Sequence, residues 1–194
     1  MSGADDASVI ARSKRDPEAF AELFRRHAPD LTRYVTRKLG QDAADDVVAE
    51  TFLAAFRQRG GYDAARPNAR PWLYGIATHL MSRHVRTEVR HLRAVERTGV
   101  DPVTEPFTER SDERLSAEAA RRRLAGALAA LPAGHRDALL LVAWAGLSYP
   151  EVAEALGVRL GTVRSRVNRA RRKLRRELGE INPMATVGEE PVHE

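Results

Sequence analysis

The chain of 194 residues is longer than one small core requires, so two small domains joined by a linker fit its length. It has no cysteine, no signal-peptide pattern and no run near the roughly 20 apolar residues that cross a bilayer, so we exclude disulfides and thiolate metal sites and expect a cytoplasmic protein without membrane insertion. Nine of its 32 basic residues fall within positions 159–176, which contain no acid, and the rest of the chain has 23 basic against 27 acidic residues.

The composition predicts an all-α protein. Alanine, arginine, leucine and glutamate dominate, and apolar residues recur at intervals of three and four. The sequence has no long alternation of β-branched or aromatic residues, the pattern that would favour strands. We therefore expect two small helical domains joined by a flexible linker, and we predict no cofactor.

Helix start and stop signals outline a first domain over residues 16–98, after a disordered N-terminus of residues 1–15. Asp16 and Pro17 favour a helix start, and Pro29 is expected to interrupt that helix and restart the chain. Gly40 is a stop signal before an amphipathic stretch over 42–57. A loop over 62–70 then precedes a long helix from Pro71 to about position 97.

The remaining residues divide into a linker, a second helical domain and a tail. Residues 99–114 contain glycine, prolines and several acids and predict the linker. Helical periodicity returns near Leu115 and continues to position 178. Residues 179–194 hold four glutamates and no lysine or arginine, so we expect a disordered acidic tail.

A helix-turn-helix pattern lies in the second domain. The segment 148–151, Ser-Tyr-Pro-Glu, is a capping box that predicts a helix start, and Gly157 predicts its end. A second helix begins near Leu160. Its apolar residues are spaced by four, three and four, which places them on one stripe facing the core: Val163, Val167, Ala170 and Leu174.

The opposite arc of that second helix mixes groups that read base edges with groups that neutralise phosphates. An arginine-rich helix can also be a solvated surface without a ligand. Here, however, the capping box, the turn, the apolar stripe and the basic arc coincide, which favours DNA binding. The predicted contact residues are Thr162, Arg164, Ser165, Arg166, Asn168, Arg169 and Arg172.

Four sequence segments resemble the extracytoplasmic-function (ECF) sigma factors of bacterial RNA polymerase. Residues 147–153, LSYPEVA, and 161–166, GTVRSR, are similar to the family's region four. Residues 45–52, DDVVAETF, resemble its polymerase-binding helix, and 71–77, PWLYGIA, resemble the start of its promoter-melting helix. The resemblance implies a factor without catalytic activity that directs RNA polymerase to specific promoters and assists promoter opening.

The resemblance also implies partners and their sites. Core RNA polymerase is expected to bind through its β′ coiled coil and β flap, and an anti-sigma factor is a further expected partner. The implied contacts with the β′ coiled coil lie on the acidic helix, at Asp45, Asp46, Ala49, Glu50 and Phe52. The family usually has glutamine at the position of Ala49.

Promoter DNA is the other implied partner, as duplex at the minus-thirty-five element and as melted strand at the minus-ten element. Capture of a single strand needs a pocket for an extruded base and cations along the backbone. The candidates for the minus-ten element are Tyr62, Asn68, His79, Arg83, Arg86 and Arg90. Many relatives have asparagine in place of His79 and aspartate in place of Arg83.

Two other classes of protein are compatible with parts of the sequence. A dimeric helix-turn-helix repressor or activator would use the N-terminal domain to sense a ligand, although the sequence indicates no apolar ligand pocket. A nuclease would use the acids Asp42, Asp45, Asp46 and Glu50 to hold a metal ion. No motif brings a nucleophile, a base and a metal site together, so we predict no metal.

Overall fold

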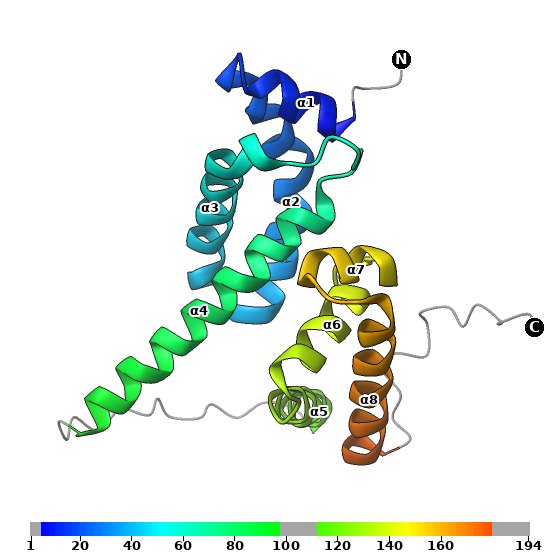
Figure 1. Ribbon diagram of the computed structural model, residues 1–194. Helices are drawn as coiled ribbons and strands as arrows, with labels where there is room; N and C mark the ends of the chain where they lie inside the picture. Colours follow the sequence, from blue (N-terminus) through cyan, green and yellow to red (C-terminus); the bar gives the residue numbers. More distant parts are fainter. Residues whose placement is uncertain (1–4, 98–111, 180–194) are drawn as a thin grey trace, which may run out of the picture. The chain divides into compact units, whose positions relative to one another are not determined.

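The computed structural model describes residues 5–97 and 112–179, and for residues 88–97, 112–118 and 121 it describes the backbone alone. Every element in this part of the chain is helical, which confirms the predicted all-α fold (Figure 1). The chain divides into two compact units, Met1–Val100 with Pro150–Gly157 and Asp101–Tyr149 with Val158–Glu194. None of the described helices is both long and apolar enough to cross a membrane.

The first unit is built mainly from α2, α3 and α4, which pack against one another. The bounds of its elements in the N-terminal part of the chain are α1 Asp6–Ser13, η1 Pro17–Ala19, α2 Phe20–Leu39, α3 Gln41–Gln58, η2 Arg59–Gly61 and α4 Arg70–Arg97. The helices bury a common core in which aromatic rings pair across elements. Phe20 meets Phe56 at 5.3 Å between ring centroids, and Tyr34 meets Tyr74 at 5.2 Å.

Helix α2 is continuous through Pro29, so the predicted interruption there is wrong. A proline inside a helix removes one hydrogen bond and crowds the preceding turn. Pro29 is exposed, so water can bind the carbonyl that loses its partner. Apolar residues on both sides of the proline, Leu23 and Leu31, are fully buried, and their packing keeps the helix intact.

The N-terminal segment contains a helix that the sequence prediction of a disordered N-terminus missed. Helix α1 spans Asp6–Ser13 and packs against α2, with Val9 and Ile10 buried at 0% and 1% exposure. The side chain of Asp5 caps it by accepting a hydrogen bond from the Ser8 N–H at 2.7 Å. Only Asp5 of the described residues precedes this helix, so the folded region begins well before position 16.

The second unit contains α5 (Asp112–Ala129), α6 (Ala133–Ala143) and α8 (Leu160–Leu178). Helix α8 packs against both α6 and α5. The break between α5 and α6 falls at Leu131 and Pro132, and Pro132 is the residue that precedes the first turn of α6. Helix α5 begins at Asp112, three residues inside the predicted linker, whereas the rest of that linker and residues 180–194 of the predicted tail lie outside the described residues.

Helix α7 spans Tyr149–Leu156 and precedes α8 by a three-residue connection. It starts one residue after Ser148, the position that the capping box predicts for the cap. Gly157 ends it with a φ of 61°, a left-handed conformation that favours glycine. Helix, short turn and helix therefore follow one another at the predicted positions.

Candidate nucleic-acid interface

One face of helix α8 is buried in the second unit. Its four predicted core residues are all buried, with exposures of 0% for Val163, Val167 and Ala170 and 6% for Leu174. Their spacing keeps them on one side of the helix. The predicted stripe is confirmed, and it fixes which face of α8 is turned outward.

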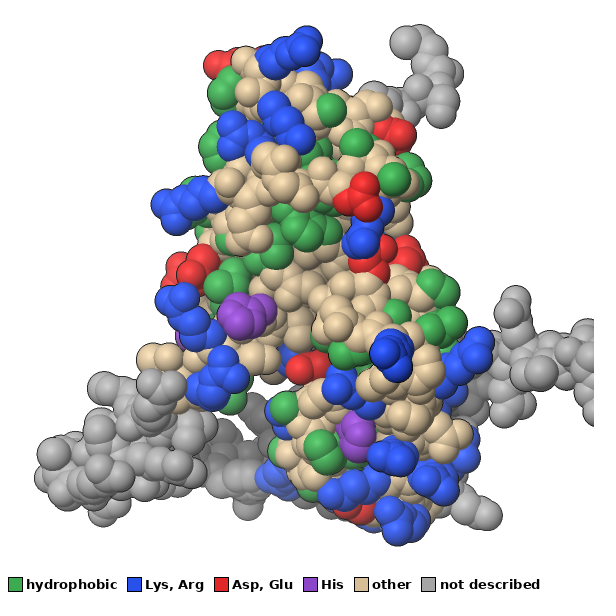
Figure 2. Space-filling model, viewed as in Figure 1, with side chains coloured by type: hydrophobic (Ala, Val, Ile, Leu, Met, Phe, Trp, Pro, Cys, Tyr) green, Lys and Arg blue, Asp and Glu red, His purple; other side chains and the backbone are tan. Residues whose placement is uncertain are grey.

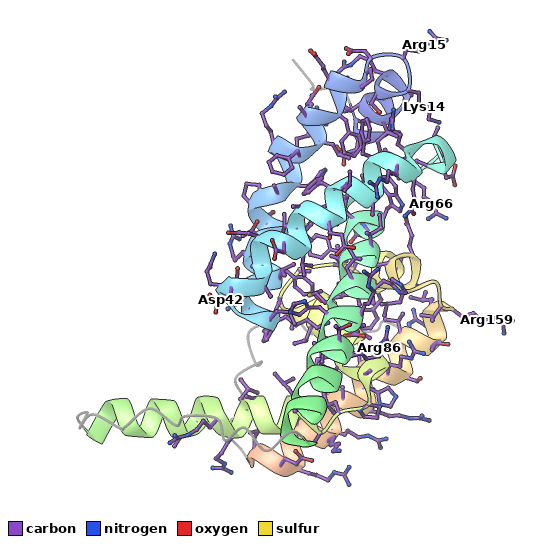
Figure 3. The ribbon with its side chains drawn as sticks, turned by 90° about the vertical axis from the view of Figure 1, so that its left-hand side faces the viewer. Lys14, Arg15, Asp42, Arg66, Arg86 and Arg159 are labelled. Atoms are coloured by element: carbon purple, nitrogen blue, oxygen red, sulfur yellow. The ribbon has the colours of Figure 1, made fainter. Side chains whose placement is uncertain are left out.

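The outward face of α8 carries the predicted base-reading and phosphate-binding side chains. The exposed members are Arg164, Ser165, Asn168, Arg169 and Arg172, and Thr162 is half-buried. Arg175 and Arg176 are also exposed on this face. Figure 2 shows Lys and Arg side chains gathered over the part of the surface that α8 forms in Figure 1. Arg159, just before the helix, also extends outward (Figure 3). Two hydrogen-bonding groups and five guanidiniums thus share one face.

Two basic residues of α8, Arg166 and Lys173, make contacts within the second unit. The half-buried guanidinium of Arg166 lies against Gly134 at the start of α6, where an added Cβ would come within 3.2 Å of it. Lys173 donates a hydrogen bond from Nζ to the Ala130 carbonyl at 2.6 Å, just beyond the end of α5. Arg166 was predicted to contact DNA, and its position next to α6 gives it a packing contact as well.

The predicted polymerase-binding residues lie on α3 and do not share one environment. Asp45, Asp46, Ala49 and Glu50 are exposed. Phe52, by contrast, is 6% exposed, and its ring packs edge-on against Phe24 of α2 at 4.8 Å between centroids.

Two apolar side chains near this acidic face were missed by the sequence reasoning. Phe24 and Leu53 are each 47% exposed. Both sit in amphipathic helices, where an apolar residue is normally assigned to the core. Leu53 directly follows the buried Phe52, so the two side chains point to different sides of α3. This position around the helix is the only sequence signal that could have indicated the exposure of Leu53.

The loop between η2 and α4 contains Tyr62 and Asn68, which the sequence assigned to the minus-ten element. Tyr62 is buried, its ring lies 4.9 Å from that of Trp72, and its hydroxyl donates to the Arg66 carbonyl at 2.8 Å. Burial raises the pKa of Tyr62 to about 12. The ring contact and the hydroxyl hydrogen bond of Tyr62 hold the loop together. Asn68, by contrast, is exposed and accepts a hydrogen bond from the Arg70 N–H at 3.0 Å.

Helix α4 presents the remaining candidates for the minus-ten element. His79, Arg83 and Arg86 are exposed, and Arg86 extends from the helix in Figure 3. Arg90 belongs to the same helix, but its side chain lies outside the described residues. Arg83 comes within 3.8 Å of Glu50 on α3, so the structure joins two residues that the sequence placed in different sites.

Asp6 of α1 is a buried carboxylate in the segment that the sequence predicts as a disordered N-terminus. Its Oδ2 lies 2.7 Å from Nε2 of His27 and accepts a hydrogen bond from the Ala69 N–H at 2.9 Å, while Oδ1 accepts one from Arg26 at 3.0 Å. Burial by itself raises the pKa of a carboxyl, but these bonds outweigh it and hold the pKa of Asp6 at about 2. Its partners are distant in sequence, so no local pattern could have revealed them.

The acidic residues of α3 do not form a metal centre in the described part of the chain. Asp42 lies at the first turn of the helix and points outward (Figure 3), and Asp46 and Glu50 are exposed. Among the described residues, no group of three histidine, aspartate or glutamate side chains could hold a metal ion.

The fold and the α8 surface define a helical DNA-binding protein, and comparison with known proteins gives the family. The model of sigma-70 region 2 matches residues 23–91, and that of sigma-70 region 4 matches residues 121–174. Among curated proteins, the RNA polymerase sigma factor CarQ of Myxococcus xanthus is 34% identical over 175 residues, which cover 84% of this chain and 91% of CarQ. The chain belongs to the ECF sigma factors, which direct RNA polymerase to promoters in transcription initiation.

Solved structures show the same architecture. The RNA polymerase sigma factor CnrH of Cupriavidus metallidurans is 32% identical over 181 residues, covering 88% of this chain and 92% of CnrH. The structure of CnrH in complex with the cytosolic domain of CnrY matches with a TM-score of 0.65 and 29% identity, covering 91% of this chain and 99% of that one. The sigma factor RpoE, solved with the anti-sigma factor NepR from Bartonella quintana, matches in fold with a TM-score of 0.60 and 24% identity over 84% of this chain and 98% of its own.

Proposed function

We propose that the outward face of α8 binds the duplex minus-thirty-five element of the promoters to which this sigma factor brings RNA polymerase. The observation that carries the proposal is the division of α8 into a buried apolar stripe and an exposed polar arc. Arg164, Ser165, Asn168 and Arg169 lie nearer the N-terminal end of the helix, the end that enters the major groove in helix-turn-helix proteins. Arg172, Arg175 and Arg176 follow along the helix as phosphate contacts.

The helix-turn-helix consists of α7 and α8, and the second functional domain extends over residues 115–178. The match of the region 4 model to residues 121–174 and the three-residue connection between the helices support this assignment. The first functional domain corresponds to residues 16–98, and helix α1 extends it toward the N-terminus.

The first unit binds core polymerase through the acidic face of α3 and captures the melted minus-ten element with the loop and α4. Exposed carboxylates at Asp45, Asp46 and Glu50 provide charge for a basic partner, and exposed Leu53 adds apolar area. Along α4, Arg83 and Arg86 provide cations for a phosphate backbone, and Asn68 of the loop provides a hydrogen-bonding group for a base.

The factor acts in the cytoplasm, has no catalytic activity of its own, and is held inactive by an anti-sigma protein. The polymerase to which it binds performs the chemistry of RNA synthesis. The likeness to CnrH, which has been solved in complex with the cytosolic domain of CnrY, supports a protein partner.

Run-off transcription with purified core polymerase on genomic fragments tests the proposal. The wild-type chain is expected to start transcripts from a defined set of promoters. Arg169→Ala should lower the yield about tenfold, since one charged base contact is lost. Arg33→Ala, which removes an exposed arginine of α2 paired with Asp30, is the matched control and should leave the yield unchanged. Equal yields from both variants would contradict the assignment of α8.

A further inference from the structure

The loop proposed to capture the minus-ten element is attached to the C-terminal end of α1 at the point where the loop begins. Lys14, directly after α1, donates a hydrogen bond from Nζ to the Gly60 carbonyl at 3.2 Å. Arg59 donates one from Nε to the Ser13 carbonyl at 3.3 Å. The end of α1 and Lys14, which is labelled in Figure 3, therefore fix residues 59–60, from which the loop departs.

The C-terminal end of the same loop is attached to the N-terminal end of α1. The Asp6 N–H donates to the Pro67 carbonyl at 3.0 Å, and the Asp6 carboxylate accepts from the Ala69 N–H at 2.9 Å. Asn68, one of the exposed residues of the loop, lies between these two bonds. Backbone groups on both sides of Asn68 are thus bound to one residue of α1.

The carboxylate that holds Ala69 is itself held from a third element. Arg26 and His27 of α2 contact its two oxygens at 3.0 and 2.7 Å, and the side chain is buried. Val9 and Ile10 anchor the middle of α1 in the core. Helix α1 is therefore fixed to α2, and the loop is fixed to α1 at both ends.

We propose that α1 is a brace for this loop and that Asp6 is a positioning residue for capture of the melted minus-ten strand, an inference that rests on the proposed function of the loop. Asp6 is buried and acts through the backbone of Asn68's neighbours. Ordering the loop before DNA arrives lowers the entropy that binding would otherwise cost. Loss of the Asp6 carboxylate should therefore weaken strand capture more than any other step.

The test compares Asp6→Ala with Arg12→Ala in the full chain bound to core polymerase. Arg12 lies on the same helix and pairs with Glu22 of α2 at 2.6 Å, so its variant loses a contact between α1 and α2 but no contact with the loop. The probe is a single-stranded oligonucleotide with the minus-ten sequence of a promoter identified by run-off transcription. Affinity for core polymerase and for a duplex minus-thirty-five fragment are measured alongside.

Asp6→Ala should lower the affinity of the holoenzyme for the oligonucleotide about tenfold, as expected for losing a hydrogen bond to a charged group. Its affinities for core polymerase and for the duplex should stay within about twofold of wild type, and Arg12→Ala should resemble wild type throughout. Asp6→Asn keeps an oxygen that can accept from Ala69, so we expect it to restore most of the affinity.

Unchanged oligonucleotide affinity in Asp6→Ala would overturn the inference. An equal loss of affinity for oligonucleotide and core polymerase would overturn it too, because Asp6 would then serve the folding of the whole unit. If the wild-type holoenzyme itself does not bind the oligonucleotide, the proposed function of the loop is wrong, and this inference is wrong with it.

Discussion

Asp6 shows how a single carboxylate can connect segments that are far apart in the sequence. It joins α1 to Arg26 and His27 of α2 and to Ala69, the residue directly before α4. Because the pKa of Asp6 falls from its usual 3.8 to about 2 on folding, the charged form favours the folded state. This contribution is complete above pH 4 and is lost as the pH falls toward 2.

Asp6→Asn should lower the free energy of unfolding by about 2 kcal/mol at pH 7, the scale of hydrogen bonds to charged groups. The difference between variant and wild type should shrink as the pH falls from 4 to 2, because the wild-type carboxyl is then protonated as well. Urea unfolding followed by circular dichroism over this pH range measures it. A difference that does not change with pH would rule out the ionised carboxylate as its source.

Arg83 and Glu50 form the second residue-scale link, between α4 and α3. Their side chains are 67% and 50% exposed and 3.8 Å apart, so the pair contributes less than about 1 kcal/mol. Arg83→Asp should therefore change the free energy of unfolding by less than about 1 kcal/mol but weaken binding of the minus-ten oligonucleotide severalfold, because an anion replaces a cation beside the strand. Arg33→Asp, on the exposed face of α2, is the control, and fluorescence anisotropy measures both variants.

At the scale of elements, the junction between α2 and α3 depends on one backbone conformation. Gly40 has a φ of 90°, which residues with a side chain rarely adopt, and no atom lies within 4 Å of an added Cβ. Any cost of substitution there comes from the backbone and not from crowding.

Gly40→Ala should lower the free energy of unfolding by about 1 to 2 kcal/mol through backbone strain. Gly60 also has open space around an added Cβ, but its φ lies outside the positive range, so Gly60→Ala should be nearly neutral. Thermal unfolding of the two variants gives the comparison, and a Gly60→Ala variant as unstable as Gly40→Ala would argue against strain as the cause.

Helix α8 separates stability and DNA binding onto its two faces. Val167→Ala should cost about 2 kcal/mol of unfolding free energy, since it removes buried methyl groups and leaves a cavity. Arg169→Ala should leave stability within about 0.5 kcal/mol of wild type while it reduces DNA affinity. Chemical unfolding and duplex binding are measured on both variants at one salt concentration. Val167→Ala should lower the free energy of unfolding, and Arg169→Ala should lower the duplex affinity.

Elements with a repeating pattern could be predicted from the sequence, and elements held by distant contacts could not. The stripe on α8 is visible because its residues recur at helical spacing. Helix α1 is eight residues long and has few large apolar side chains, and the carboxylate that anchors it is bound by residues 20 to 63 positions away. Pro29 is a local signal for a break, but tertiary packing overrides it.

At the scale of the whole molecule, the uneven charge predicts how DNA binding responds to salt. The exposed arginines of α8 are concentrated on one face, while the chain outside 159–176 is slightly acidic. Each phosphate contact releases counterions, so the logarithm of affinity should fall linearly with the logarithm of salt concentration.

Arg172→Ala should reduce the slope of that salt dependence by about 1 and weaken binding to specific and unrelated duplexes alike. Arg164→Ala should instead weaken the specific duplex more than the unrelated one. Titrations at several salt concentrations, with holoenzyme and both duplexes, distinguish a phosphate contact from a base contact. Identical behaviour of the two variants would mean that the arc does not divide into the two kinds of contact.

The two faces of α8 also have a consequence for how such a factor can diversify. Exposed side chains on the arc can be exchanged at little cost in folding, because the buried stripe, with Arg166 and Lys173, fixes the helix in its unit. A library randomised at Arg164, Ser165, Asn168 and Arg169 should therefore remain largely folded. Selection from this library can then yield factors that start transcription at new promoters. In the same cell, these factors would act independently of the original factor and its promoters.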